Sequence, residues 1–219
     1  MNKEQILAKV LELNCRGTYG TEYLDVEKFN ALVAALEQDI RDESNKALGR
    51  ADTARLAKAI IKTGIKHAGK DSKMAYACTL DGIQYVLDGY RIAAFYDPVG
   101  VPEWAEKEDW YNVRKLVDGA FYTNVPLTLP PLAELKAEIK IAKAEKKCCL
   151  YTFYHDGAYI HINAQFLLDY VQAFPDIQVY ASNTGASAGR NPIYVSSDKG
   201  FGIILPVNIP ISAPGFHHV

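Results

Sequence analysis

Apolar residues recur at helical spacing in five segments of the chain. Side chains three and four residues apart fall on one face, as in a helix that packs against a core. Asp52 or Thr53 can cap the third helix, and Pro130 and Pro131 introduce the fourth. The predicted helices span residues 2–13, 27–40, 53–67, 132–147 and 163–174.

Short apolar runs between turn residues predict strands after three of these helices. "KMAYACTL", "IQYVL" and "YRIAAFY" follow the third helix and are separated by Asp-Gly turns. "CCLYTFYHDGAYIHI" follows the fourth helix and is expected to form a hairpin. "IQVYAS", "PIYVSS" and "GFGIILPVNI" are expected to be successive strands after the fifth.

The remaining segments lack a clear period. The polar residues 41–52 are expected to connect two helices, 97–111 to form a loop and 117–131 to be extended. "GASAGRNP", residues 185–192, lies between two predicted strands rather than before a helix, so it is interpreted as a hairpin loop and not a phosphate-binding loop.

The order of the elements predicts an α+β fold with helices packed on one side of antiparallel sheets. A pattern of one strand, one helix and three strands occurs twice, which suggests half-domains over about 50–125 and 126–210 of one domain, 50–210. Residues 1–49 are a helical N-terminal segment, for which a degenerate part of the same fold is the alternative. Residues 211–219 are expected to be an irregular tail.

Composition indicates a soluble globular protein, with 49% hydrophobic and 23% charged residues. No apolar run approaches the roughly 20 residues that cross a bilayer, and "MNKEQILAKV" lacks the apolar core of a secretion signal. A cytoplasmic protein without membrane contact is therefore expected. Its cysteines should be reduced: Cys15, Cys78, Cys148 and Cys149.

No spacing of residues is typical of a metal site or a catalytic centre. The cysteines lack the paired spacing of a zinc site, and no Ser-His-Asp pattern or phosphate loop is present. We therefore expect no enzymatic activity, no cofactor and no metal. A small-molecule enzyme would need a pocket in the aromatic-rich segment 104–122, where core packing is the simpler explanation: Trp104, Trp110, Tyr111, Phe121 and Tyr122.

Charge is unevenly distributed, although the net charge is only -2. Residues 50–73 hold seven Lys or Arg against two Asp, and 131–147 hold five Lys against three Glu. Each of these helices carries a basic row at steps of three and four, opposite its apolar side. The rows are Arg55, Lys58, Lys62 and Lys66, and Lys136, Lys140, Lys143 and Lys147.

Two basic rows on one side of a sheet would form a positive surface that meets a polyanion. Lysine is a point charge on a flexible stem, so the rows are expected to contact nucleic acid without sequence specificity and in a salt-dependent manner. The alternative is that both rows are solvated helix faces.

The apolar run "YVLDGYRIAAF", residues 85–95, is broken by an acid, a glycine and an arginine. Together with the preceding helix and strands it resembles the start of the middle domain of the bacterial DNA polymerase III beta subunit, the sliding clamp. The signature there is of the type Thr-Asp-Gly-His-Arg-Leu-Ala, against 87–93 here. The C-terminal region, 162–209, is similar to the end of that family, and the matching residues are Asn163, Ala164, Leu167, Leu168, Asp169, Asn191, Pro192, Leu205, Pro206 and Val207.

The resemblance implies a DNA-clamp-like fold, a non-catalytic role in DNA replication, and duplex DNA as the partner of the basic rows. In the family the two segments form a pocket for short hydrophobic peptides of DNA polymerases and other replication or repair proteins. Carried over by position, the pocket would be lined by Gly89, Tyr90, Arg91, Ile92, Ile203, Leu205 and Pro206. A plain Asp-Gly hairpin turn is the alternative for the first segment.

This chain also departs from the family pattern. A bacterial clamp chain has three domains and closes a ring as a dimer, so a ring of this shorter chain would require a homo-oligomer with more subunits. Tyr90 replaces the usual histidine, Asn208 replaces the final arginine, and the residues beyond it could cover the pocket. The rival hypothesis is a stand-alone interaction module that does not encircle DNA, with a mobile element or phage as its suggested source.

Overall fold

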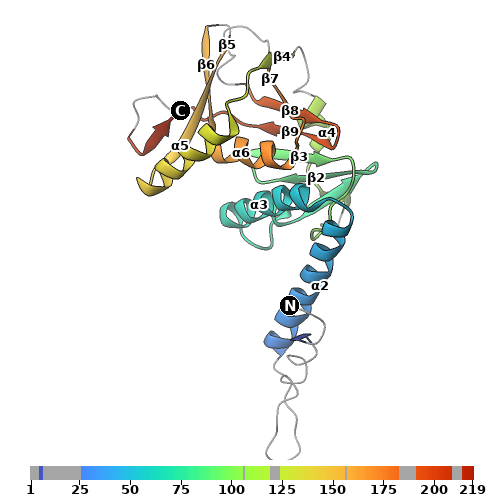
Figure 1. Ribbon diagram of the computed structural model, residues 1–219. Helices are drawn as coiled ribbons and strands as arrows, with labels where there is room; N and C mark the ends of the chain where they lie inside the picture. Colours follow the sequence, from blue (N-terminus) through green and yellow to red (C-terminus); the bar gives the residue numbers. More distant parts are fainter. Residues whose placement is uncertain are drawn as a thin grey trace, which may run out of the picture. The chain divides into compact units, whose positions relative to one another are not determined.

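The computed structural model describes residues 5–6, 26–105, 107–118, 124–155, 157–182, 191–208 and 214–219 (Figure 1). Contacts within the chain divide it into an N-terminal unit, Met1–Ala51, and a C-terminal unit, Asp52–Val219. The predicted helix over 2–13 and the loop over 185–192 fall almost wholly outside the described residues.

The described part of the N-terminal unit is one long helix, α2 (Val26–Ala47). It continues through residues that were expected to form a polar connection, and that expectation was wrong. Pairs four residues apart support the polar turns, with Gln38 Nε2 donating to Asp42 Oδ1 at 2.9 Å and Arg41 lying 3.5 Å from Glu37. A polar sequence with such pairs can remain helical without a continuous apolar stripe.

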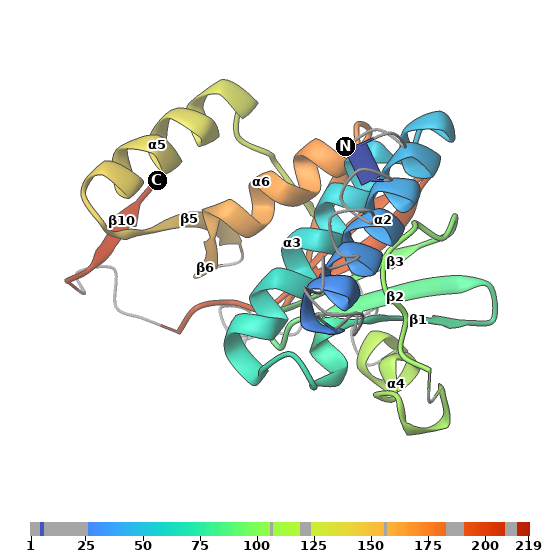
Figure 2. The same ribbon diagram turned by 90° about the horizontal axis from the view of Figure 1, so that it is seen from below.

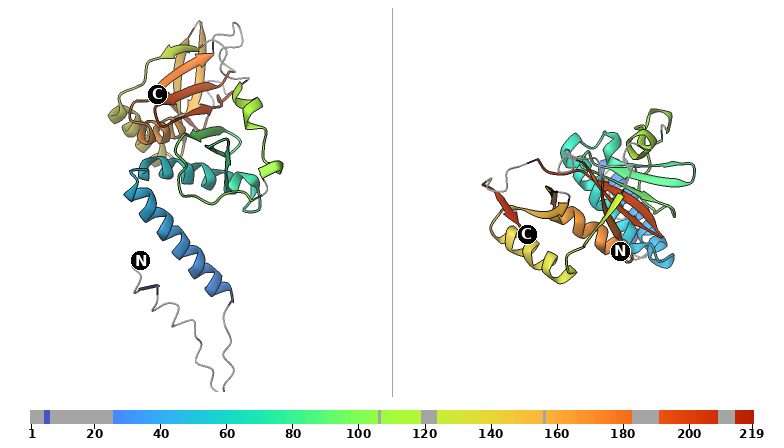
Figure 3. Two further views of the ribbon diagram at one scale, coloured as in Figure 1. Left: turned by 90° about the vertical axis from the view of Figure 1, so that its right-hand side faces the viewer. Right: turned by 90° about the horizontal axis from the view of Figure 1, so that it is seen from above.

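The C-terminal unit is built around a seven-stranded antiparallel sheet in the order β1-β2-β3-β9-β8-β7-β4 (Figures 1 and 3). Strand β3 pairs with β9, so the strands that follow the third and fifth predicted helices form one continuous sheet. The strands are β1 (Ala77–Leu80), β2 (Ile83–Leu87), β3 (Arg91–Phe95), β4 (Asn124–Leu127), β7 (Gln178–Ser182), β8 (Ile193–Ser197) and β9 (Gly200–Ile204).

A second sheet has the order β10-β5-β6 and contains the predicted hairpin, β5 (Cys148–His155) and β6 (Ala158–Asn163). Strand β10 (Phe216–His218) lies in the tail and runs parallel to β5. The described end of the tail is therefore not irregular. Its backbone is fixed by bonds such as Val219 N to Leu150 O at 2.9 Å, which satisfy an otherwise open edge of β5.

Helices α3 (Ala51–Ala68) and α6 (Ala164–Ala173) cover one face of the large sheet, and α5 (Leu132–Ala144) packs against α6 and β5 in the same core. The expected α+β fold is confirmed. The opposite face is also covered, because a second apolar cluster packs there with η2 (Lys107–Asp109) and α4 (Val113–Asp118) (Figure 2). Residues 117–118 end this helix, so the prediction that they are extended was wrong.

Alternation along the central strands explains the two cores. Ala93 and Phe95 of β3 face the helices α3 and α6, whereas Ala94 faces the α4 side. On the neighbouring strand, Ile204 joins the first cluster and Ile203 the second. Both faces of β3 and β9 are thus buried, which accounts for their nearly continuous apolar sequence.

Gly202 in β9 is required by the close packing of α6. A Cβ atom there would lie 2.2 Å from the ring of Tyr170, whose hydroxyl donates to Ile92 O at 2.5 Å. Burial raises the pKa of Tyr170, so the hydroxyl keeps its proton and remains a donor at any ordinary pH. The missing side chain at 202 therefore lets the helix bond directly to the sheet.

We expect Gly202→Ala to lower the free energy of unfolding by about 1–3 kcal/mol, because the buried ring cannot move away without strain. Urea unfolding followed by circular dichroism measures the change. Lys199→Ala, at an exposed position in the preceding turn, is the matched control and should have little effect. Equal stability of both variants would show that the Tyr170 ring yields freely.

Candidate functional site

The break in the run 85–95 is a tight bend between β2 and β3. Asp88 Oδ1 accepts from the backbone N–H groups of Tyr90 and Arg91, both at 2.9 Å. Gly89 adopts a φ of 87°, a conformation that side chains disfavour. Asp88 therefore closes the bend and Gly89 permits it, which explains both interruptions of the apolar sequence.

The bend lies against the end of β9. Leu205 N donates to Tyr90 O at 2.9 Å, and Arg91 is paired with Ile204 in the ladder. The two segments that carry the sequence resemblance are therefore neighbours in space, as the hypothesis of a shared pocket requires.

Arg91 is buried between two carboxylates. Its Nε lies 2.8 Å from Asp88 Oδ2, and its Nη1 lies 2.6 Å from Asp169 Oδ2 on α6. Asp88 and Arg91 are only 0% and 2% exposed. Burial alone would lower the pKa of Arg91, but the hydrogen bond to Asp169 and the charge of Asp88 outweigh this effect and raise it. The guanidinium is therefore permanently charged and fully neutralised.

Further contacts of this group tie the bend to two helices. The Arg91 guanidinium carbon lies 4.1 Å from the centre of the Phe166 ring, and Nη2 lies 3.4 Å from Thr63 Oγ1 on α3. The exposed Tyr90 side chain also points to α3, with 3.2 Å between its hydroxyl and His67 Nδ1.

A cavity of about 280 Å³ opens beside the bend. Five of the seven predicted pocket residues line it: Gly89, Arg91, Ile92, Ile203 and Leu205. Tyr90 and Pro206 are not in its lining, since Tyr90 is directed to His67 instead. Pro192, which was matched to the family but not assigned to the pocket, also lines it.

The sequence did not indicate four further lining residues, which are Met74, Leu87, Tyr111 and Leu116. Met74 lies in η1 (Lys73–Ala75), and Tyr111 and Leu116 belong to the segment around α4 on the far side of the sheet. The aromatic content of 104–122 was the only sequence signal for this wall, and it was interpreted as packing. All four additions are apolar or aromatic, so the cavity is predominantly apolar.

Both basic rows lie at the surface, with Lys58 partly buried and the other members exposed. Some of the charges are already paired: Arg55 Nη2 lies 2.8 Å from Asp52, and Lys147 Nζ lies 2.9 Å from Glu145. Lys143 Nζ donates to Gln165 Oε1 of α6 at 2.8 Å.

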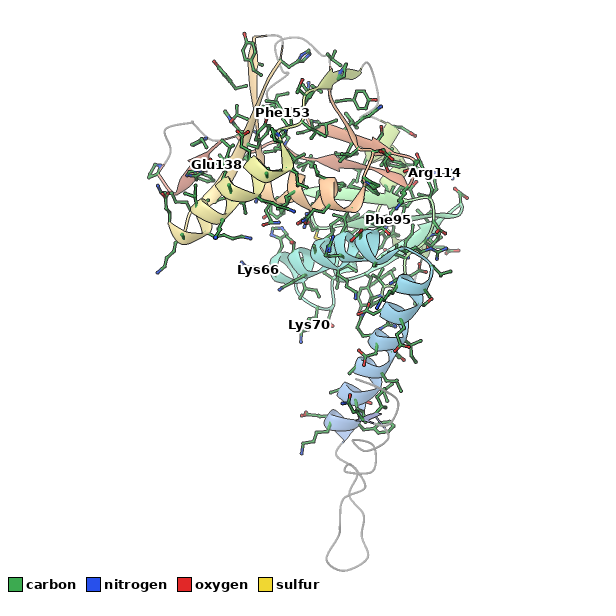
Figure 4. All side chains as sticks on the ribbon, in the orientation of Figure 1. Lys66, Lys70, Phe95, Arg114, Glu138 and Phe153 are labelled. Atoms are coloured by element: carbon green, nitrogen blue, oxygen red, sulfur yellow. The ribbon has the colours of Figure 1, made fainter. Side chains whose placement is uncertain are left out.

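The two rows lie on helices that have α6 between them. Helix α6 lies between α5 and α3 in both Figures 1 and 2, and its sequence, AQFLLDYVQA, contains no Lys or Arg. In Figure 4, the labels Lys66 and Lys70 lie at the C-terminal end of α3, and the label Glu138 lies on α5. The rows are therefore treated as two basic strips, one on α3 and one on α5.

The described end of the tail lies on β5 rather than in the cavity. Glu138 of α5 is 2.7 Å from His217 Nε2, and Cys148 N donates to Gly215 O at 3.0 Å. Residues 214–219 are absent from the cavity lining, so the expectation that this part of the tail covers the pocket was wrong.

The described residues contain no cluster of three or more His, Cys, Asp or Glu that could hold a metal ion. Within the same part of the chain, no helix has the length and apolar character needed to traverse a bilayer. The strongly perturbed pKa values belong to buried groups. Burial, followed by smaller effects of Cys148 and Glu138, raises the pKa of the Cys149 thiol to about 11.

No protein-family model and no curated protein matches the chain. A crystal structure from Eubacterium rectale, described as a DNA polymerase III beta subunit, is similar with a TM-score of 0.45 and 14% identity. The Helicobacter pylori beta clamp bound to a DNA ligase peptide is similar with a TM-score of 0.44 and 10% identity. Each match covers 70% of this chain and 63% of the other, so it spans less than two thirds of the length of each similar structure.

Two ion pairs of equal length test the importance of burial. We expect Arg91→Ala to lower the free energy of unfolding by about 3–5 kcal/mol, because it leaves the buried Asp88 charge uncompensated. Arg55→Ala removes an arginine that also lies 2.8 Å from an aspartate three residues earlier, but both of those side chains are 61% exposed.

The control should therefore change stability little, since solvent screens an exposed pair. Thermal and urea unfolding of both variants measure the difference. Similar losses in the two variants would contradict the role assigned to the buried network.

Proposed function

We propose that this chain is a non-catalytic, clamp-like protein whose cavity beside the bend binds a short apolar peptide of a partner protein. The single observation that carries the proposal is the preformed apolar cavity between the bend, β9 and the α4 segment. Its rim is open to a partner, because Leu205 is 45% exposed and Leu116 is 52% exposed.

The chemistry of the wall favours apolar side chains. Arg91 is the only charged residue of the described lining, and its charge is neutralised by Asp88 and Asp169. A peptide therefore meets no unpaired charge when it enters. A volume of about 280 Å³ is small compared with the roughly 300–1,000 Å³ of typical ligand pockets, which suits a few peptide side chains better than a large cofactor.

The proposed partners are peptides of DNA polymerases or of other replication and repair proteins. The similar Helicobacter pylori clamp is bound to a DNA ligase peptide, which supplies a first probe. Affinity should be modest, because only a few side chains are buried and the peptide loses conformational freedom.

Contact with duplex DNA is the second part of the proposal. The observation that favours it is the exposure of three lysines on α3 and α5 that make no ion pair with a described residue in the structure: Lys62, Lys66 and Lys140. Two separate strips can each meet phosphates, provided that DNA spans α6.

The rival function is a stand-alone interaction module with solvated lysines. Light scattering separates the two, because encirclement of DNA requires a closed homo-oligomer, whereas the module would be a monomer or simple dimer.

We expect Leu205→Asp to weaken peptide binding at least tenfold, because it places a charge at the rim of an apolar cavity. Fluorescence anisotropy of a labelled DNA ligase peptide measures the affinity. Leu132→Asp is the control, as it changes an exposed leucine in the first turn of α5, away from the cavity. Equal loss in both variants, or no saturable binding by the unmodified chain, would refute the assignment of this cavity.

We expect the double variant Lys62→Glu with Lys140→Glu to abolish salt-dependent retention on duplex DNA. In each single variant, the slope of log affinity against log salt should fall in magnitude by about 1 if that lysine contacts a phosphate. Lys115→Glu with Lys199→Glu carries the same charge change outside the rows. Unchanged retention of the first variant would restrict the function to peptide binding.

A further inference from the structure

A second cavity, of about 210 Å³, lies at the outer edge of the large sheet. It is lined by Tyr76, Glu103, Trp104 and Ala105 and shares no lining residue with the apolar cavity. The segment beside β1 holds its two sides together, since Ala77 N donates to Pro102 O at 2.9 Å and Trp104 N donates to Ala77 O at 2.7 Å. The cavity is therefore fixed by backbone pairing rather than by a free loop.

Two aromatic rings form part of its wall. The centres of the Tyr76 and Trp104 rings lie 5.4 Å apart, with an angle of 63° between their planes. Trp104 also packs against the second core cluster, which contains Trp110. Its ring is consequently held in place before any ligand arrives, and the face of an indole is the strongest cation-binding surface among the aromatic side chains.

The third wall is a carboxylate whose position is also fixed. Glu103 Oε1 accepts from Thr79 Oγ1 at 2.6 Å and from Gln84 Nε2 at 2.8 Å. Gln84 is only 1% exposed and is anchored in both directions by the backbone of Val99. Because both donors bind Oε1, these bonds leave Oε2 for a further donor. A buried glutamine thus orients an exposed acid.

The sequence around Glu103 is also negatively charged. Residues 103–109 contain four acids and one lysine. The chain itself already places an ammonium between an aromatic ring and an acid nearby, because Lys73 Nζ lies 5.6 Å from the centre of the Tyr111 ring and 2.8 Å from Asp109 Oδ1. The cavity at Tyr76 and Trp104 offers the same combination to a cation from outside.

We propose that Tyr76, Glu103 and Trp104 form a binding site for a lysine or arginine side chain of a partner protein. The cation would lie against the aromatic rings and donate a hydrogen bond to Glu103 Oε2. This site does not depend on the proposed peptide function of the apolar cavity, because a different set of residues forms it.

The test uses the full chain and three small probes, which are the N-acetyl methylamides of lysine, arginine and norleucine. Norleucine keeps the lysine stem and lacks the charge. The indole N–H resonance of Trp104 is the readout, assigned with Trp110→Phe. Both indole nitrogens are buried and have no hydrogen-bond partner among the described residues, so a cation on the Trp104 ring should shift its N–H signal through the ring.

We expect saturable shifts with the two cations, with a Kd on the order of millimolar for single side chains, and none with norleucine. Glu103→Gln keeps the hydrogen bonds within the chain and removes the charge, and it should weaken cation binding about tenfold. Tyr76→Leu should weaken it as well. Leu205→Asp, which alters the apolar cavity, should leave it unchanged.

An equal response to norleucine would show a merely apolar surface and overturn the proposal. Absence of saturable shifts with both cations would overturn it too. So would unchanged cation binding by Glu103→Gln, provided that the backbone amide spectrum confirms an intact fold.

Discussion

The structure beside the apolar cavity depends on one buried cation, the guanidinium of Arg91. Removing this group from water is costly, and the cost is offset because two carboxylates, a hydroxyl and an aromatic face surround it. Asp88 serves twice, since one oxygen binds the guanidinium and the other closes the bend through two backbone N–H groups. Asp88 therefore fixes the shape of the bend, and Arg91 fixes the position of the bend against α6. A neutral residue at 91 could fill the space but could not bind both carboxylates.

Helix α6 connects this network to the basic surface. Asp169 binds Arg91 through Oδ2 and accepts from Gln165 Nε2 through Oδ1, and Gln165 in turn accepts from Lys143 of α5. Tyr170, the next residue along, bonds to β3 over Gly202. The polar and apolar attachments of α6 thus converge on the strand that carries Arg91. Because α6 lies between the two basic strips, its placement also sets the distance between them.

Much of the local structure could be predicted from the sequence, because it depends on neighbouring residues. The helices at 53–67 and 163–174 and the hairpin at 148–162 follow from period and turn residues, and the bend follows from Asp88 and Gly89. Contacts between distant segments could not be predicted in the same way. Asp169, the partner of Arg91, is 78 residues away in the sequence. Met74, Tyr111 and Leu116 come from separate segments that the tertiary fold brings to the same cavity. The end of α2 beyond residue 40 and strand β10 show no apolar period, since polar pairs support the first and backbone pairing the second.

Met74 shows how the far wall of the cavity is positioned. A Cβ atom at Gly64 of α3 would lie 2.3 Å from Met74 O, so only glycine allows the helix and η1 to approach this closely. Ser72 accepts from Met74 N and fixes the start of the same turn. Met74 then faces the apolar cavity, while Tyr76, two residues later, faces the acidic one. One short segment, held by a helix on one side and by the sheet edge on the other, therefore supplies a wall to each cavity, and the 3-10 turn η1 places Met74 and Tyr76 in different ones.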